Sequence, residues 1–204
     1  MPNDPYSLLN AHIAVSHETV EKLSKYHNTL LKWQKKINLI GKDTIDEAWT
    51  RHFLDSLQLV NYIDDKNKVI VDLGSGAGFP GMALAIAGYN SVHLIESDAR
   101  KVAFLLEISR ITATKLSIHH CRIEDNPVVK IDIFTSRACA SLDKLLHLIA
   151  PFLSHETICL FHKGKNYAIE NEEALLHWQY NLDIIPSIAS SEGVILKLSN
   201  IRKA

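Results

Sequence analysis

The chain has 204 residues, of which 47% are hydrophobic and 22% are charged, so its composition excludes a disordered or low-complexity protein. The formal net charge of −1 at pH 7 does not indicate a nucleic-acid partner, yet it does not exclude one, because a local basic patch is sufficient. No stretch approaches the roughly 20 apolar residues that cross a bilayer, and the N-terminus lacks the basic and apolar regions of a signal peptide. We therefore expect a cytoplasmic protein with no membrane partner.

Neither the cysteines nor the histidines have the spacing of a metal site. Cys121, Cys139 and Cys159 are far apart and odd in number, which matches neither a disulfide framework nor a CxxC pair. The histidines are scattered, and His119 and His120 in a predicted strand would point to opposite faces of a sheet. We expect buried free thiols, no bound metal and a monomeric chain.

The first part of the chain, 1–66, is predicted to be a helical extension. Ser16 is placed to cap a helix over 16–38. The apolar residues of that helix recur at the spacing of one helix face, namely Tyr26, Leu30, Trp33 and Ile37. A second helix is predicted from Thr44, because Thr44 and Glu47 have the spacing of a capping box. Since a short apolar helical pair needs a partner surface, we expect the extension to pack on the domain that follows.

The second part, 67–204, alternates predicted strands with predicted helices. Five short apolar runs are predicted to be strands: 69–73, 92–96, 116–121, 131–136 and 157–163. Helices are predicted between and after them, at 81–87, from Asp98 onward, at 141–153 and at 170–178. This alternation indicates an α/β fold with a doubly wound, parallel sheet. The last two predicted strands, 180–186 and 193–199, lack a long helix between them and are expected to form an antiparallel C-terminal edge hairpin.

A glycine-rich turn follows the first predicted strand, where ligands bind in such sheets. It contains Gly74, Gly76 and Gly78, whose missing side chains allow the backbone to approach a ligand. A dinucleotide-binding turn needs GxGxxG, whereas this turn has Phe79 at the position of the third glycine. The carboxylate of Asp72 would also oppose a pyrophosphate, but it suits the amino group and sulfonium of S-adenosylmethionine (SAM). The turn therefore favours SAM over NAD as the cofactor.

Acidic residues follow the next two predicted strands. Glu96 ends the second strand, 22 positions after Gly74, where a carboxylate is placed to bind ribose hydroxyls. After the third strand, Glu124 or Asp125 is placed to accept a hydrogen bond from an adenine amino group. Each of these acids taken alone is also explained as a solvated surface residue. The distance between Glu96 and the glycine turn favours the ribose role for Glu96.

Motifs spread over about 30–165 are similar to those of one known family. They are Trp33 with INLIG (37–41), RHFLDSL (51–57), VDLGSGAGFPG (71–81), LIESDARKVAFL (94–105), RIED (122–125), SRACASL (136–142) and KG (163–164). In this order they resemble the RsmG (GidB) family, the bacterial small-subunit rRNA guanine-N7 methyltransferases. The resemblance implies a Rossmann-like, SAM-dependent methyltransferase domain that transfers a methyl group to N7 of a guanine. The implied partner is 16S rRNA or the small ribosomal subunit.

The resemblance also implies which residues bind the cofactor. They are Gly74 and Phe79 in the turn, Glu96 at the ribose, Ile123 and Glu124 at the adenine, and Arg137. Asp72, Gly76 and Gly78 join this set by their place in the turn. The chain departs from the family at 190–198, which has no Arg or His where relatives often carry a basic stretch. Lys197, Arg202 and Lys203 are the nearby replacements.

Arg137 is the candidate catalytic residue, because it follows the fourth strand, where the methyl acceptor meets SAM in this fold. In one interpretation it anchors SAM or the target guanine, and in the other it forms a structural ion pair with Asp72 or Glu124. Guanine N7 carries a lone pair and no proton, so its attack on the methyl group needs no general base. We therefore expect the reaction to depend on proximity and orientation.

Basic residues near the same edge are candidates for contacts with RNA phosphates, namely Arg51, His52, Lys163 and Lys165. Lys165 is almost as well explained as a solvated lysine. Arg51 and His52, together with Asp55, are equally well explained as ties between the helical extension and the sheet domain.

Two other functions remain open. A SAM-dependent methyltransferase of a small molecule or protein would use the N-terminal helices as a lid over a closed pocket. A non-catalytic SAM-binding or nucleotide-sensing module would bind SAM without transferring its methyl group. A basic, open cleft favours RNA, and an apolar, closed cleft favours a small acceptor.

Overall fold

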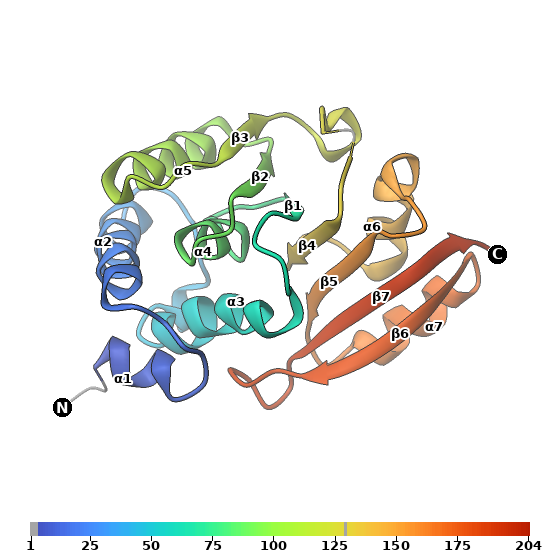
Figure 1. The fold of residues 1–204 in the computed structure, drawn as a ribbon, viewed down its shortest axis with the longest axis horizontal. Coiled ribbons are helices and arrows are strands. Elements are labelled where there is room, and N and C mark those ends of the chain that lie inside the picture. The colour runs from blue at the N-terminus through green and yellow to red at the C-terminus, as the bar shows by residue number, and fades with distance from the viewer. Residues whose placement is uncertain (1–3, 129) are drawn as a thin grey trace.

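A computed structural model describes residues 4–128 and 130–204 and contains one seven-stranded sheet (Figure 1). Its strands are β1 (Val69–Leu73), β2 (Ser91–Glu96), β3 (Ser117–His120), β4 (Ile133–Arg137), β5 (Ile158–Lys163), β6 (Trp178–Pro186) and β7 (Val194–Lys203). Its α-helices are α1 (Pro5–Asn10), α2 (His17–Gln34), α3 (Asp55–Leu57), α4 (Gly81–Ile86), α5 (Ala99–Thr112), α6 (Leu142–Ile149) and α7 (Tyr167–Leu175).

The sheet has the strand order β3-β2-β1-β4-β5-β7-β6. The first five strands of that order pair in parallel, and β7 pairs antiparallel with both β5 and β6. The predicted parallel sheet and the predicted C-terminal hairpin are therefore confirmed. The direction of winding reverses between β1 and β4, which is where an open α/β sheet leaves a crevice for ligands.

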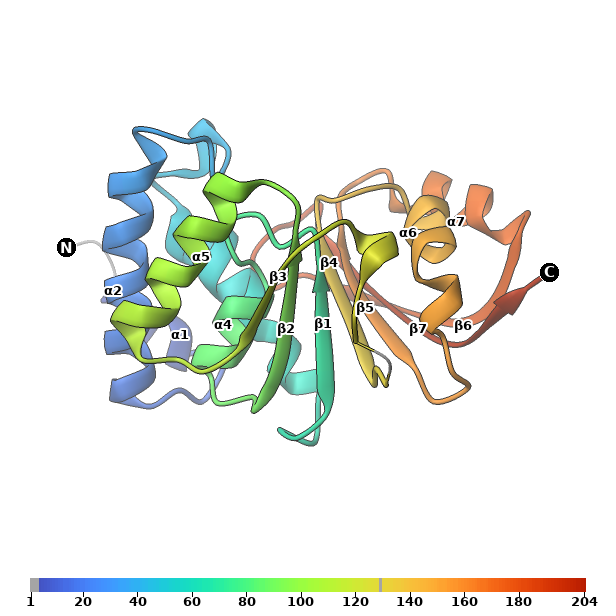
Figure 2. The same ribbon diagram turned by 90° about the horizontal axis from the view of Figure 1, so that it is seen from above.

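Helices cover both faces of the sheet, as expected for buried parallel strands (Figure 2). One face is covered by α2, α4 and α5, and the other by α6 and α7. The strands between them are almost continuously apolar, and Ile70 and Val71 of β1 point to opposite cores although both are fully buried. Asp98 caps α5 as predicted, since its Oδ1 accepts hydrogen bonds from the backbone N–H groups of Arg100 and Lys101.

The helix α2 begins where the sequence predicts but ends earlier. The Oγ of Ser16 accepts a hydrogen bond of 3.1 Å from the Thr19 backbone N–H, which confirms Ser16 as the cap. The helix ends at Gln34 and does not continue to residue 38. The Oε1 of Gln34 accepts a hydrogen bond from the backbone N–H of Leu39 (2.9 Å) and thereby stabilises a turn. Ile37 consequently packs on the core from that turn.

The predicted capping box of the second helix is wrong. Thr44 ends a single 3-10 turn at Lys42–Thr44, and the next helical segment begins only at Trp49. The Thr44 hydroxyl donates to the Gly41 carbonyl at 2.8 Å and lies 2.7 Å from the His52 ring, so it is not available to cap a helix. The Trp49–Leu54 segment has the wide π-helical winding and continues into α3.

The apolar face of α2 packs against the sheet domain. Tyr26 is fully buried, its ring stacks on Phe79 with centroids 5.2 Å apart, and its hydroxyl donates to the carbonyl of Ala77 in the glycine turn. Trp33 meets Phe104 of α5 edge to face at 5.5 Å. These contacts agree with the predicted docking of 1–66 on 67–204. The two-part division of the chain stays a prediction.

The described residues include no helix that is both long enough and apolar enough to cross a membrane. They also include no group of three or more His, Cys, Asp and Glu side chains arranged to hold a metal ion. Cys159 is buried as expected, Cys121 is half-buried, and Cys139 is exposed. The expectation of a buried Cys139 is therefore wrong, because this residue lies in the loop after β4, although its Sγ lies against Gly74.

Candidate active site

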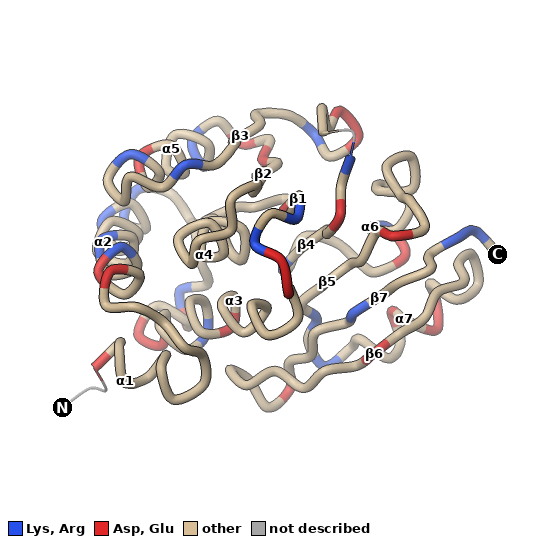
Figure 3. Tube along the Cα trace, viewed as in Figure 1, with Lys and Arg blue, Asp and Glu red and all other residues tan. Residues whose placement is uncertain are grey.

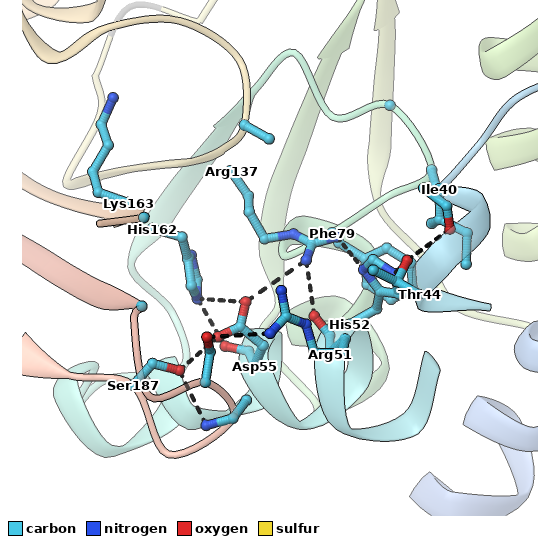
Figure 4. A pocket seen from close by; sticks show the side chains of 18 of the residues that line it. Ile40, Thr44, Arg51, His52, Asp55, Phe79, Arg137, His162, Lys163 and Ser187 are labelled. Atoms are coloured by element: carbon cyan, nitrogen blue, oxygen red, sulfur yellow. Dashed lines mark hydrogen bonds and ion pairs between the residues drawn. The ribbon is translucent and has the colours of Figure 1, made fainter. Parts of the chain in front are cut away.

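A cavity of about 660 Å³ opens at the carboxyl ends of β1, β4 and β5 (Figure 4). Its walls come from segments that are distant in sequence. They are the glycine turn at 74–79, the 39–44 segment, the 51–55 segment, the loops after β4 and β5, and the β6–β7 turn. The cavity therefore lies at the crevice that the strand order predicts.

The three glycines at 74, 76 and 78 have positive φ angles, and each has a different neighbour where a side chain would stand. A Cβ on Gly74 would lie 2.6 Å from the Sγ of Cys139, and one on Gly78 would lie 2.7 Å from the Tyr26 hydroxyl. The nearest atom to a Cβ on Gly76 is 3.7 Å away. Packing thus requires glycine at 74 and 78, whereas the space beside Gly76 is free. Because Gly76 lines the cavity, its backbone is open to a ligand.

Glu96 braces the glycine turn from the end of β2. Its Oε2 accepts a hydrogen bond of 2.8 Å from the Gly76 backbone N–H, and its Oε1 accepts one of 2.7 Å from the Asp98 backbone N–H. The side chain is buried and does not line the cavity. A carboxylate has about four acceptor positions, so both oxygens can still accept from ribose hydroxyls. The ribose role stays a prediction.

Asp72 lies behind the turn, inside the sheet. It has no exposed surface, its Oδ1 accepts a hydrogen bond of 2.8 Å from the Thr135 hydroxyl, and its Oδ2 has no partner among the described residues. Burial raises the pKa of Asp72 to about 6, although hydrogen bonds from Thr135 and Ser75 oppose the rise. The side chain does not line the cavity, so the predicted contact with SAM remains a prediction.

The predicted adenine contacts lie beyond β3. Ile123 and Glu124 belong to the 3-10 turn Ile123–Asp125, where Ile123 is half-buried and Glu124 is exposed. Neither residue lines the cavity. Their assignment to the adenine therefore rests on the family resemblance alone.

Arg137 ends β4 and lines the cavity (Figure 4). The Nη2 lies 2.5 Å from the His52 Nδ1, the Nη1 donates to the Arg51 carbonyl at 2.9 Å, and the guanidinium lies 5.3 Å from the Phe79 ring centroid. Its ion-pair partner is Asp55, at 3.7 Å. The predicted partners Asp72 and Glu124 are wrong, because the 51–55 segment covers the end of β4 and supplies the carboxylate.

Two of the four predicted RNA contacts are not free to bind a phosphate. Burial, together with the charges of Arg137 and Arg51, lowers the pKa of His52 to about 3, so its ring is uncharged. The Lys163 ammonium is 6% exposed and is bound to Glu170 at 2.7 Å and to the Ala140 carbonyl at 2.6 Å. In the free protein these two side chains are therefore held by other partners, and their contacts with RNA stay predictions.

The other two predicted RNA contacts, Arg51 and Lys165, are exposed at the cavity rim. Arg51 donates to the Ser190 hydroxyl at 3.2 Å. The proposed replacements Arg202 and Lys203 lie far from the cavity, because β7 runs antiparallel to β5 and carries them to the opposite end of the sheet. Lys197 lies within β7, and its Nζ is 4.0 Å from the Oδ2 of Asp183.

The sequence analysis missed His162 as part of the site. Its Nε2 donates to the Asp55 backbone carbonyl at 2.7 Å, while its buried Nδ1 has no partner in the described part of the chain. Burial lowers the pKa of His162, so the ring is neutral. Asp55 itself is fixed by Gln58 (2.7 Å) and Ser187 (3.0 Å). Nothing in the apolar run 157–163 distinguishes His162 from a core residue, whereas RHFLDSL did mark Asp55.

The sheet order, the helices on both faces and the glycine turn at the point of reversal give a Rossmann-like α/β fold, which solved SAM-dependent methyltransferases also have. Magnesium protoporphyrin IX methyltransferase from Synechocystis, whose structure holds bound SAM, aligns with a TM-score of 0.62 at 10% identity. The alignment covers 92% of this chain and 98% of that chain. The similarity shows a shared fold.

Sequence comparison identifies one family within this fold. The sequence model described as GidB, rRNA small subunit methyltransferase G, matches residues 19–192. Ribosomal RNA small subunit methyltransferase G of Rhodospirillum rubrum is 45% identical over 194 residues, which are 95% of this chain and 96% of that protein. The protein of the same name from Orientia tsutsugamushi is 42% identical over 193 residues, with 95% and 96% covered. The chain therefore belongs to the GidB family, which confirms the resemblance.

Proposed function

We propose that this chain transfers a methyl group from SAM to N7 of a guanine in 16S rRNA. One observation carries the proposal. The cavity brings the open backbone of Gly76 together with the Arg137 guanidinium, in a chain whose relatives are named rRNA methyltransferases. A cofactor site and a site for a methyl acceptor thus share one space.

The residues of the glycine turn fit SAM. The unfilled space beside Gly76 admits a ligand close to the backbone, which is the feature that a cofactor cradle needs. Gly74, Gly76 and Phe79 would hold the cofactor from the turn, Glu96 would accept from the ribose, and Ile123 and Glu124 would contact the adenine. When bound, SAM supplies the methyl group on a positively charged sulfonium.

Arg137 would orient the acceptor. Its planar fork can donate to the guanine O6 and leave N7 free to attack the methyl carbon. The C–S bond breaks as the N7–C bond forms, so the positive charge passes from the sulfur to the guanine ring. Asp55, at 3.7 Å from Arg137, offsets the guanidinium charge next to that ring. Because N7 has no proton, no group of the site has to act as a base.

A basic segment beside the cavity supports RNA as the acceptor. Residues 22–42 contain six lysines and no Asp or Glu. Lys32, Lys35, Lys36 and Lys42 are exposed and have no ion-pair partner among the described residues. The same segment continues into Ile40 and Gly41, which line the cavity. Figure 3 shows Lys and Arg positions along α2 and α5, with Asp and Glu positions among them.

Methylation of small-subunit rRNA with labelled SAM, followed by mapping of the modified base, tests the acceptor. We expect turnover to change little between about pH 7 and pH 9, in contrast to the bell-shaped profile of acid–base catalysis. A methyl group found on a ring carbon or an exocyclic nitrogen would contradict the N7 assignment. Transfer to a small molecule or a protein in place of rRNA, or SAM binding without any transfer, would support the alternative functions.

Gly76→Ala tests the cofactor site. The added methyl group occupies the free space where the backbone faces the ligand and displaces no protein atom, although the φ of +57° strains any side chain there, so the variant must first be shown to fold. We expect calorimetry to show at least a tenfold loss of SAM affinity, about 1.4 kcal/mol. Unchanged affinity in a folded variant would place the cofactor elsewhere. NAD binding tighter than SAM would reject SAM as the ligand.

A further inference from the structure

A series of hydrogen-bonded side chains runs along the cavity wall from Arg137 to the 3-10 turn at Lys42–Thr44 (Figure 4). Arg137 Nη2 lies 2.5 Å from His52 Nδ1, and His52 Nε2 lies 2.7 Å from the Thr44 Oγ1. The Thr44 hydroxyl lies 2.8 Å from the Gly41 carbonyl. Thr44 and Gly41 belong to the N-terminal part of the sequence, while Arg137 ends a central strand of the sheet.

The direction of each hydrogen bond in this series is fixed by chemistry. A guanidinium has only donors, so the His52 Nδ1 facing Arg137 must accept and carries no proton. The ring is neutral, so its single proton is on Nε2, which then donates to the Thr44 oxygen. A carbonyl only accepts, so the single hydroxyl proton of Thr44 points to Gly41. Every group therefore donates to the next one, from Arg137 to Gly41.

We propose that Thr44 is a positioning residue for methyl transfer, whose hydroxyl fixes the tautomer of His52 and thereby holds the Arg137 fork in the cavity. The inference rests on the proposed role of Arg137. If the acceptor at Nε2 were lost, the His52 proton could move to Nδ1. There it would face the guanidinium, and the hydrogen bond that orients Arg137 would be replaced by two opposed donors.

The surroundings of the series favour this role over simple packing. His52 is 5% exposed and its ring stacks on Phe79 at 5.3 Å, so it cannot reach solvent for another partner. Thr44 is the partner at its far nitrogen, and a buried donor without a partner is unfavourable. Arg137 is also held by the Arg51 carbonyl and Asp55, both through Nη1. The His52 contact is what fixes Nη2.

Three variants separate positioning from packing. Thr44→Val keeps the shape and removes the hydroxyl, and Thr44→Ser keeps the hydroxyl. Thr50→Val removes a hydroxyl from the Trp49–Leu54 segment as a control. We expect Thr44→Val to lower the turnover of rRNA methylation about tenfold, as is typical when a partner that orients a site residue is lost. The KM for SAM should change less than twofold, as roughly expected for an effect on the acceptor alone. Thr44→Ser should restore turnover, and Thr50→Val should behave as the unaltered protein.

Nitrogen NMR of the His52 ring gives a second readout that does not depend on activity. In the unaltered protein the ring should be neutral with the proton on Nε2, and in Thr44→Val this signature should be lost or mixed. A proton on Nδ1 in the unaltered protein would overturn the proposal, even if the Thr44 variants did not fold. Equal turnover for Thr44→Val and Thr44→Ser would overturn it as well. Absence of any rRNA methylation by the unaltered protein would reject the proposed function and leave the tautomer test standing.

Discussion

Asp72 places an ionisable group inside the sheet, directly behind the glycine turn. Its pKa is about 6 in the folded protein and 3.8 as the ordinary value, so the folded state binds more protons than the unfolded state between these values. Stability from this group is therefore complete below about pH 4 and is lost as pH rises through about 6. Asp72→Asn removes that dependence. Between about pH 4 and pH 7, the free energy of unfolding of the variant should rise by about 2 to 3 kcal/mol relative to the unaltered protein.

Denaturant unfolding at several pH values measures this difference. Asp98→Asn is the matched control, because the pKa of Asp98 is lowered where that of Asp72 is raised. Hydrogen bonds from Arg100 lower the pKa of Asp98 to about 2, so its stabilising effect is present above the ordinary pKa and is lost as pH falls. In Asp98→Asn, the free energy of unfolding should therefore fall less below about pH 4 than in the unaltered protein. Its pH dependence between pH 4 and pH 7 should be unchanged. If the difference in the free energy of unfolding between Asp72→Asn and the unaltered protein did not change with pH, the Asp72 carboxyl group would ionise normally in the folded protein.

The position of a site residue was predictable from the sequence where a local motif determines the backbone conformation. It was not predictable where the residue's interaction partner comes from a distant segment. Arg137 and Gly76 both line the cavity as their positions after β4 and β1 imply. Lys163 was predicted as a free basic residue, yet it is paired with Glu170. His52 was left open between an RNA contact and a tie to the sheet domain, and its ring is neutral because it is buried. Such pairing depends on tertiary contacts, which local spacing does not reveal.

At the scale of elements, α2 is joined to the glycine turn by packing and by one hydrogen bond. Leu30 and Tyr26 are fully buried, and the Tyr26 hydroxyl donates to Ala77 within the turn. We expect Leu30→Ala to lower the free energy of unfolding by about 2 to 5 kcal/mol. If the extension is docked, calorimetry should still show one transition at a lower temperature. Two separate transitions in the intact protein would contradict docking.

Tyr26→Phe tests the hydrogen bond to the glycine turn separately from the packing of α2 on the sheet domain. The variant keeps the aromatic ring and leaves the Ala77 carbonyl without its donor, which costs about 1 to 3 kcal/mol for a buried group. We expect it to weaken SAM binding, whereas Leu30→Ala should leave the SAM affinity of the folded protein unchanged. A loss of affinity in both variants would show only general loosening.

Helices and strands were predicted correctly where local sequence determines them, and incorrectly where a tertiary contact does. All five predicted parallel strands form, because short apolar runs separated by helical segments specify the strands of a parallel sheet from local sequence. The helix predicted from Thr44 failed, because Thr44 is recruited by His52 and Gly41. A capping spacing in the sequence cannot show that the hydroxyl has another partner eight residues away.

At the scale of the whole molecule, charge is distributed unevenly although the net charge is only −1. The first half of α2 is locally neutral, since Lys22 pairs with Glu18 at 2.8 Å and Lys25 with Glu21 at 2.9 Å. The second half and the following turn carry lysines without acids. This contrast lies along one helix, and the chain continues from its basic end into residues 39–41, which line the cavity. An RNA strand bound at the cavity would therefore lie near these lysines.

The salt dependence of RNA binding tests this arrangement. Lys35→Ala with Lys36→Ala removes two unpaired charges beside the cavity, while Lys22→Ala with Lys25→Ala removes two paired charges from the same helix. Both changes alter the net charge equally. If Lys35 and Lys36 contact phosphates, the slope of log affinity against log salt should fall by about 1 to 2 for the first pair only. Affinity for small-subunit rRNA at low salt should fall with it, and SAM affinity should stay the same. Equal slopes for the two double variants would show that net charge, and not this end of α2, attracts the RNA.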